Sequence, residues 1–203
     1  MHGWTKPLLL AALLTSTATF AIAQAQPTIK DRLDGAVSTV TGSPMADLDI
    51  DMKHVLDATK GLGGKPVETL PAVEARKQPT PTDGVKALLK EQGKSTDPEP
   101  GVTAKDMTYP TEGGTQTVRI YTPDGASGPL PVVVYYHGGG FVIADLDTYD
   151  ATPRAIAKGA KAIVASVEYR HAPEAKFPAQ QEDAVAAYKW VLENAKSFGG
   201  DAS

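Results

Sequence analysis

The sequence lacks cysteine, has few histidines, and carries no excess of basic residues. None of its 203 residues is cysteine, which excludes disulfide bonds, thiol catalysis and cysteine-ligated metal. The four histidines are scattered at positions 2, 54, 137 and 171, and no two have the spacing of ligands on one helix, so the sequence predicts no metal site and no cofactor. The formal net charge is −4, and no basic stripe is present that could bind a phosphate backbone, so no nucleic-acid partner is expected.

The remaining composition is that of an ordinary globular protein. Hydrophobic residues make up 41% and charged residues 22% of the chain. These values, together with the length, are sufficient for one substantial domain and do not indicate a disordered or fibrous protein.

Residues 1–25 have the pattern of a secretory signal peptide. Lys6 provides a basic start, residues 8–14 form a short apolar core, and small residues favour cleavage near Ala23 or Ala25. The alternative, a membrane anchor, would require about 20 apolar residues, and this run is shorter. We therefore expect a secreted or periplasmic protein with no stable membrane anchor after cleavage.

Residues 26–100 predict a helical cap or N-terminal arm. Three short amphipathic helices are expected: residues 47–59, residues 71–77, and a helix capped by Thr82 or Asp83 that stops at Gly93. Because such short helices cannot bury their apolar faces alone, they should lie on something larger. Two interpretations stay open, a packing arm and a lid over a site.

Residues 101–203 predict an α/β fold with a mixed sheet. An antiparallel hairpin is expected over residues 105–122, followed by strands at 132–136 and 162–169 and helices at 148–158 and 178–198, with Gly159 separating helix from strand. Both later strands are continuous apolar runs and should be buried on both faces. Alternation of strand and helix predicts parallel pairing in the centre and helices on both faces.

The last helix shows an apolar stripe and a clear stop. The stripe comprises Ala184, Val185, Tyr188, Val191, Leu192 and Ala195. Two glycines at 199 and 200 end the helix, and the strand that should follow it is not expected within these residues. In a fold that alternates strands and helices, this ending suggests a chain that has been cut.

A glycine triplet follows the strand predicted at residues 132–136. Residues 131–141 read Pro-Val-Val-Val-Tyr-Tyr-His-Gly-Gly-Gly-Phe, so an apolar run ends in three consecutive glycines. Since glycine has no Cβ, it permits left-handed backbone and close approach of another molecule. The triplet is therefore either a tight turn or an anion-binding site.

Three motifs in series resemble the hormone-sensitive-lipase-like family of α/β-hydrolase esterases. They are His-Gly-Gly-Gly-Phe at 137–141, Tyr-Arg-His-Ala-Pro-Glu at 169–174, and Phe-Pro-Ala at 177–179 followed by Glu182 and Asp183. The resemblance covers residues 45–203 and implies an α/β-hydrolase fold, here incomplete, with a small-molecule ester as substrate. Residue 171 departs from the family, which usually has an apolar residue there.

The resemblance implies roles for several residues. The amides of Gly139 and Gly140 would form the oxyanion hole, with loop support from His137 and Gly138. Three charged residues, Arg170, Glu174 and Asp183, would form an ion-pair network that braces the loop after the second parallel strand.

The nucleophile of such an enzyme is absent from these residues. No Gly-x-Ser-x-Gly motif occurs in the chain, so the catalytic serine, acid and histidine are missing. We therefore expect the N-terminal part of a carboxylic-ester hydrolase, truncated before the nucleophile elbow and inactive in isolation. Two alternatives stay open: a non-catalytic binding protein with an α/β-hydrolase-like fold, and an amide or formamide hydrolase of the same fold. Acyl and alcohol specificity and oligomeric state also stay open.

Overall fold

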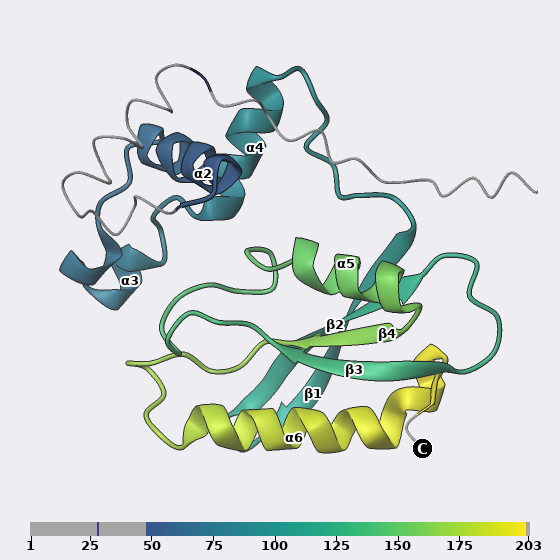
Figure 1. Ribbon diagram of the computed structural model, residues 1–203. Helices are drawn as coiled ribbons and strands as arrows, with labels where there is room; N and C mark the ends of the chain where they lie inside the picture. Colours follow the sequence, from purple (N-terminus) through teal and green to yellow (C-terminus); the bar gives the residue numbers. More distant parts are fainter. Residues whose placement is uncertain (1–27, 29–47, 202–203) are drawn as a thin grey trace, which may run out of the picture. The chain divides into compact units, whose positions relative to one another are not determined.

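The computed structural model describes residue 28 and residues 48–201 (Figure 1). The chain divides into two compact units, residues 1–51 and residues 52–203. The predicted signal peptide at residues 1–25 lies outside the described residues. Within the part that is described, no helix combines the length and the apolar character that crossing a membrane requires.

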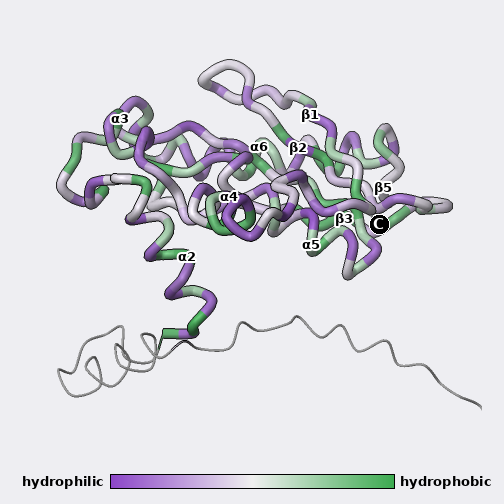
Figure 2. Tube along the Cα trace, turned by 90° about the horizontal axis from the view of Figure 1, so that it is seen from above, coloured by the Kyte–Doolittle hydropathy of each residue, from purple (hydrophilic) through white to green (hydrophobic). Residues whose placement is uncertain are grey.

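Short helices precede the sheet, as predicted. They are α2 (Ile50–Gly61), the 3₁₀ turn η1 (Val67–Thr69), α3 (Ala72–Ala75) and α4 (Pro81–Glu91). Hydrophilic and hydrophobic segments are interspersed along α2 and α4 (Figure 2), which is typical of amphipathic helices. The predicted domain boundary near residue 100 stays a prediction, although the first strand begins just after it.

The cap of α4 differs from the prediction. Thr80, rather than Thr82 or Asp83, is the N-cap, and its side chain accepts a hydrogen bond from the Asp83 amide. The Asp83 carboxylate in turn accepts from the Thr80 amide, which completes a capping box. The helix begins earlier than predicted because Pro81 takes its first position, for which proline is well suited.

Five strands form one mixed sheet in the order β1-β2-β4-β3-β5. They are β1 (Val102–Thr111), β2 (Gly114–Pro123), β3 (Leu130–Tyr136), β4 (Ile163–Val167) and β5 (Gly200–Asp201). The pairs β1–β2 and β2–β4 are antiparallel, and the pairs β3–β4 and β3–β5 are parallel. The hairpin and the mixed sheet are confirmed. The strand after the last helix was expected only beyond these residues, which was wrong, because β5 starts at Gly200.

Two helices cover opposite faces of the sheet, as predicted: α5 (Ala151–Ala160) on one face, and α6 (Ala179–Asn194), extended by the 3₁₀ turn η2 (Ala195–Phe198), on the other (Figure 1). Gly159 does not separate α5 from β4, because it lies inside the helix. The helix ends one residue later, and Lys161 takes the left-handed conformation with φ of 51°.

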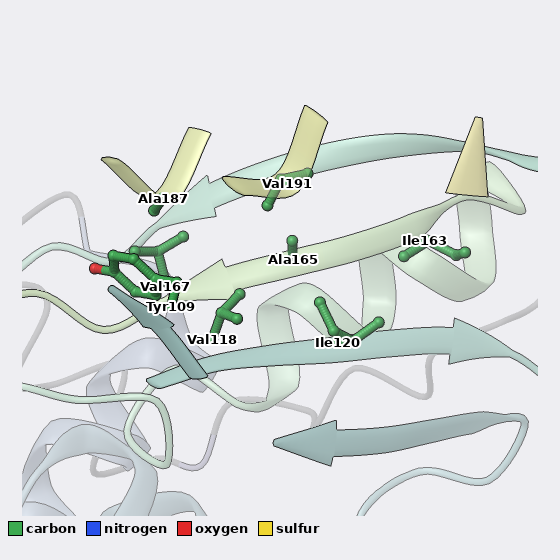
Figure 3. Packing of buried hydrophobic residues seen from close by; sticks show 8 residues of the cluster. All are labelled: Tyr109, Val118, Ile120, Ile163, Ala165, Val167, Ala187 and Val191. Atoms are coloured by element: carbon green, nitrogen blue, oxygen red, sulfur yellow. The ribbon is translucent and has the colours of Figure 1, made fainter. Parts of the chain in front are cut away.

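The core is centred on β4, whose five residues are all buried. Alternate residues point to opposite faces, so Ile163, Ala165 and Val167 face α6 while Val164 packs in the smaller cluster beside α5. Figure 3 shows the larger cluster, made of Tyr109, Val118, Ile120, Ile163, Ala165, Val167, Ala187 and Val191. Because β4 has a strand on each side and a helix on each face, it holds the sheet together.

Burial differs from the prediction on β3. It was expected to be buried on both faces, but Val133 and Tyr136 are each more than one third exposed. Among the described residues, β3 pairs on its outer side only at Leu130 and Pro131, where β5 runs beside it. The rest of that side is therefore uncovered.

Burial also differs on α6. The predicted apolar stripe is largely exposed at Val185, Tyr188 and Leu192. Two members of the predicted stripe, Val191 and Ala195, are buried, and the other buried residues of the helix are Ala179, Gln180, Asp183 and Ala187. Small and polar residues make up much of the buried face, so hydrophobicity alone predicted that face only in part.

Candidate active site

The glycine loop leaves the carboxyl end of β3 with a strained backbone. Gly139 has φ of 133° and Gly140 has φ of 61°, and the following Phe141 is also left-handed with φ of 64°. The amides of Val142 and Ile143 donate to the Gly139 carbonyl at 3.0 Å, which closes the turn. The glycine triplet therefore forms a tight turn, which is one of the two interpretations that the sequence left open.

The two central amides of this turn have no acceptor within the described residues. Neither the Gly139 N–H nor the Gly140 N–H donates a hydrogen bond there, although backbone donors in folded proteins are nearly always paired. Gly139 also borders a cavity of about 950 Å³. Its other lining residues include Ala75, Thr80, Ile143, Tyr149 and His171. Two unused N–H groups in a turn beside a cavity can donate hydrogen bonds to a ligand oxygen.

The three glycines are needed for different reasons. A Cβ on Gly139 would lie 2.8 Å from the carbonyl carbon of Ile143 and still closer to its oxygen, so no side chain fits. A Cβ on Gly140 would meet nothing within 4 Å. Gly138 has no positive φ, but a Cβ there would lie 2.8 Å from the Tyr149 hydroxyl oxygen. Close packing, rather than a special backbone conformation, thus requires glycine at 138.

His137 is enclosed behind the loop. Its Nδ1 lies 2.8 Å from the Gly138 carbonyl oxygen and its Nε2 lies 3.2 Å from Glu168 Oε1. The ring stacks on Tyr169 with 4.5 Å between centroids, and the Tyr169 hydroxyl donates to the His137 carbonyl at 2.7 Å. Burial opposes the charged imidazole, but the contacts with Glu168 and Gly138 outweigh it and raise the pKa of His137.

Glu168 is a site residue that the sequence motifs did not reveal. It follows β4 directly, and its Oε1 lies 3.2 Å from His137 Nε2 and 3.3 Å from His171 Nε2. Its Oε2 accepts a hydrogen bond from the Leu146 amide at 3.2 Å. Burial alone would raise the pKa of this carboxyl, but the two imidazoles lower it to about 2. Its position could have revealed it, because Glu168 follows a strand that is parallel to β3, and parallel strands end at the same edge of the sheet.

The predicted ion-pair network is only partly correct. Arg170 and Asp183 do pair, with Arg170 Nη2 2.8 Å from Asp183 Oδ1 and Arg170 Nε 2.9 Å from Oδ2. Glu174 does not join them. Its carboxylate instead accepts two hydrogen bonds from Arg76, at 2.9 and 2.7 Å, and this contact lowers the pKa of Glu174 to about 2.

Arg76 joins the helical segment to both loops of the site. It follows α3, and its Nε donates to the Val142 carbonyl at 2.6 Å, just after the glycine turn. Its Nη2 donates to the Ala172 carbonyl at 2.6 Å, in the loop after β4. One guanidinium thus satisfies two backbone carbonyls and one carboxylate. Nothing in the local sequence distinguishes Arg76 from other surface arginines.

Replacing Arg76 by methionine should reduce the free energy of unfolding by about 2 kcal/mol, because the Val142 and Ala172 carbonyls lose a charged donor while the aliphatic stem is retained. The matched control is Lys77→Met, which removes an adjacent cation whose amine contacts Glu74 on the surface and should change stability by less than about 0.5 kcal/mol. Urea unfolding measures both. Equal effects of the two variants would contradict the role given to Arg76.

Comparison with known proteins agrees with this architecture. Residues 133–203 match a family model described as the alpha/beta hydrolase fold. The carboxylesterase NlhH of Mycobacterium tuberculosis is 47% identical over 128 residues, which are 61% of this chain and 40% of that protein. An ethyl acetate hydrolase of Pseudomonas putida is 35% identical over 140 residues, which are 68% of this chain and 42% of that protein. The chain thus spans about two fifths of the length of these relatives.

Solved structures give the same result. A hyperthermophilic esterase from the archaeon Pyrobaculum calidifontis has a TM-score of 0.59 and 35% identity, covering 76% of this chain and 46% of that one. An ester hydrolase from the metagenome of Lake Arreo has a TM-score of 0.60 and 36% identity, covering 76% and 48%. Motifs, strand order and these matches show that the chain has the α/β-hydrolase fold and that it is similar to carboxylesterases of the hormone-sensitive-lipase-like type.

Proposed function

We propose that this chain supplies the oxyanion-binding part of a carboxylic-ester hydrolase that works through a serine acyl-enzyme. The observation that carries the proposal is the pair of amides at Gly139 and Gly140, which have no acceptor in the described part of the chain and lie in a turn that borders a cavity. Ester hydrolysis creates a negative oxygen in its tetrahedral intermediate, and preorganised N–H groups stabilise that charge.

The other residues of the loop have supporting roles in this proposal. His137 ties the loop to Glu168 at the end of β4, and Gly138 lets the chain pass close to Tyr149. No Gly-x-Ser-x-Gly motif occurs among these 203 residues, so the proposal assigns the roles of nucleophile, acid and catalytic histidine to none of them. The relatives' names, carboxylesterase and ethyl acetate hydrolase, favour small esters with short acyl groups as substrates.

The test is to express the complete open reading frame that encodes these residues and to assay it with p-nitrophenyl acetate and butyrate. We expect ester hydrolysis that a serine-directed phosphonate abolishes, and no turnover by the 203-residue chain alone. An N-aryl acetamide in the same assay separates ester from amide hydrolysis. A complete product that binds esters without hydrolysing them would contradict the proposal and favour a binding protein.

We also propose that the protein is exported and acts outside the cytoplasm. The support is the sequence of residues 1–25 alone, with its basic start, apolar core and small residues near the end. Mass spectrometry of the mature protein from periplasm and culture medium should give an amino terminus just after Ala23 or Ala25. Full-length protein confined to the cytoplasm would contradict export.

A further inference from the structure

Two histidines that lie far apart in the sequence come together at the edge of the sheet. His137 follows β3 and His171 lies in the loop after β4, and their ring centroids are 5.8 Å apart. Glu168 lies between them, 3.2 Å from His137 Nε2 and 3.3 Å from His171 Nε2 through the same oxygen, Oε1. One ligand atom from each of the three residues lies within 4.8 Å of the other two. The ends of two parallel strands thus bring these three side chains together, and a search for histidines at helical spacing could not find this cluster.

The separations of these atoms suit a tetrahedral metal ion. Zinc binds imidazole nitrogen and carboxylate oxygen at about 2.0–2.1 Å, so two ligand atoms on a tetrahedral zinc lie about 3.3 Å apart. The two measured nitrogen-to-oxygen separations are 3.2 and 3.3 Å. Two imidazoles with one carboxylate also favour zinc over magnesium or calcium, which prefer oxygen ligands.

Neighbouring groups already orient the ligand atoms. His137 Nδ1 lies 2.8 Å from the Gly138 carbonyl oxygen. If Nδ1 carries the hydrogen and donates it to this carbonyl, Nε2 of the neutral ring has a lone pair that faces Glu168. The second carboxylate oxygen of Glu168 accepts the Leu146 amide, which fixes the direction of Oε1. Histidine ligands of metals commonly donate their other ring nitrogen to a carbonyl or carboxylate in this way.

His171 provides an independent indication. Its Nε2 is buried and makes no hydrogen bond within the described part of the chain, although a buried ring nitrogen normally has a partner. The nitrogen lies close to Glu168 Oε1, but not in hydrogen-bonding geometry. A metal ion bound between the three residues would give this nitrogen a partner.

We propose that His137 Nε2, Glu168 Oε1 and His171 Nε2 bind a divalent zinc-type cation behind the glycine loop. Three protein ligands leave one coordination position for water, and Glu168 and His171 also border the cavity of about 950 Å³. The ion would connect the end of β3 to the end of β4 and so fix the loop that carries Gly139. The proposal rests on this geometry and is independent of ester hydrolysis.

The experiment uses the chelator-treated chain without an oligohistidine tag, with zinc chloride as the probe. Titration calorimetry should show one zinc per chain. At a zinc concentration about 100 times the dissociation constant, the melting temperature should rise by roughly 5–10 °C. The variant His171→Leu, which carries an apolar residue of similar size, should weaken zinc binding at least tenfold. The control His54→Gln removes a histidine outside the cluster and should leave zinc binding unchanged.

X-ray absorption at the zinc edge of the unmodified protein keeps the test decisive if His171→Leu does not fold. Scattering from two imidazoles and from light oxygen ligands is the expected result. Three outcomes would each overturn the proposal. They are zinc bound by fewer than two imidazoles, zinc binding that His171→Leu leaves unchanged, and no zinc binding at about 100 micromolar zinc.

Discussion

The variant Gly139→Ala of the complete protein should lose about a hundredfold or more in kcat/KM for ester hydrolysis. An alanine Cβ would collide with the Ile143 carbonyl, and the backbone at 139, with φ of 133°, is one that residues with a side chain rarely adopt. The turn must therefore move, and the amides at 139 and 140 move with it. Displacing one oxyanion donor typically costs a factor of about 10²–10³ in kcat.

The neighbouring glycine provides the matched control. Gly140 has φ of 61°, in the left-handed region, and a Cβ there meets nothing within 4 Å. The variant Gly140→Ala retains its N–H and its space, so only the left-handed conformation is penalised, by about 1–2 kcal/mol. Steady-state kinetics with p-nitrophenyl butyrate should show a much smaller loss than for Gly139→Ala. Equal losses would mean that steric displacement at 139 is not the cause.

The largest effect on stability is expected for Asp183→Ala. The Asp183 side chain is fully buried and accepts hydrogen bonds from the Arg170 amide, Nε and Nη2. Removing the carboxylate leaves the Arg170 guanidinium and amide without their acceptor. Loss of one partner of a buried pair costs about 3–5 kcal/mol, and the low end applies because Arg170 is partly exposed. Urea unfolding of the complete protein measures the loss.

Glu182 is the matched control for Asp183. It is the preceding residue on α6, and its carboxylate lies 3.5 Å from the same Arg170 Nη2, but it is exposed. The variant Glu182→Ala should change the free energy of unfolding by less than about 0.5 kcal/mol. A loss at Glu182 as large as the loss at Asp183 would show that burial does not determine the strength of the pair.

Most elements of the fold follow from local patterns. Alternating residues in the hairpin, the continuous apolar run of β4 and glycines after helices all predicted elements that the structure contains. The errors concern burial. The face that α6 buries is set by what packs against it, and Ala187 with Asp183 does not look like an apolar stripe. The partial burial of β3 depends on where β5 runs, which no local pattern reports.

Prediction of the site was limited in a similar way. The glycine loop could be found because its chemistry is contained in adjacent residues. Glu168 and Arg76 could not, since the hydrogen-bonding partners of their side chains lie 22 to 31 and 66 to 98 residues away in the chain. The histidines looked unrelated because helical spacing was the criterion, whereas two strand ends bring His137 and His171 together. The distances of the ring nitrogens to Glu168 could be learned only from the fold.

The central position of β4 has a consequence for local opening. Because β4 is hydrogen-bonded on both edges and buried on both faces, exposing its amides requires disruption of both neighbouring strands. Its amides should therefore be among the slowest in the chain to exchange hydrogen for deuterium. Glu168 continues directly from this strand, and its amide donates to the Thr117 carbonyl. The carboxylate that holds His137 is thus anchored in the part of the molecule that opens least often.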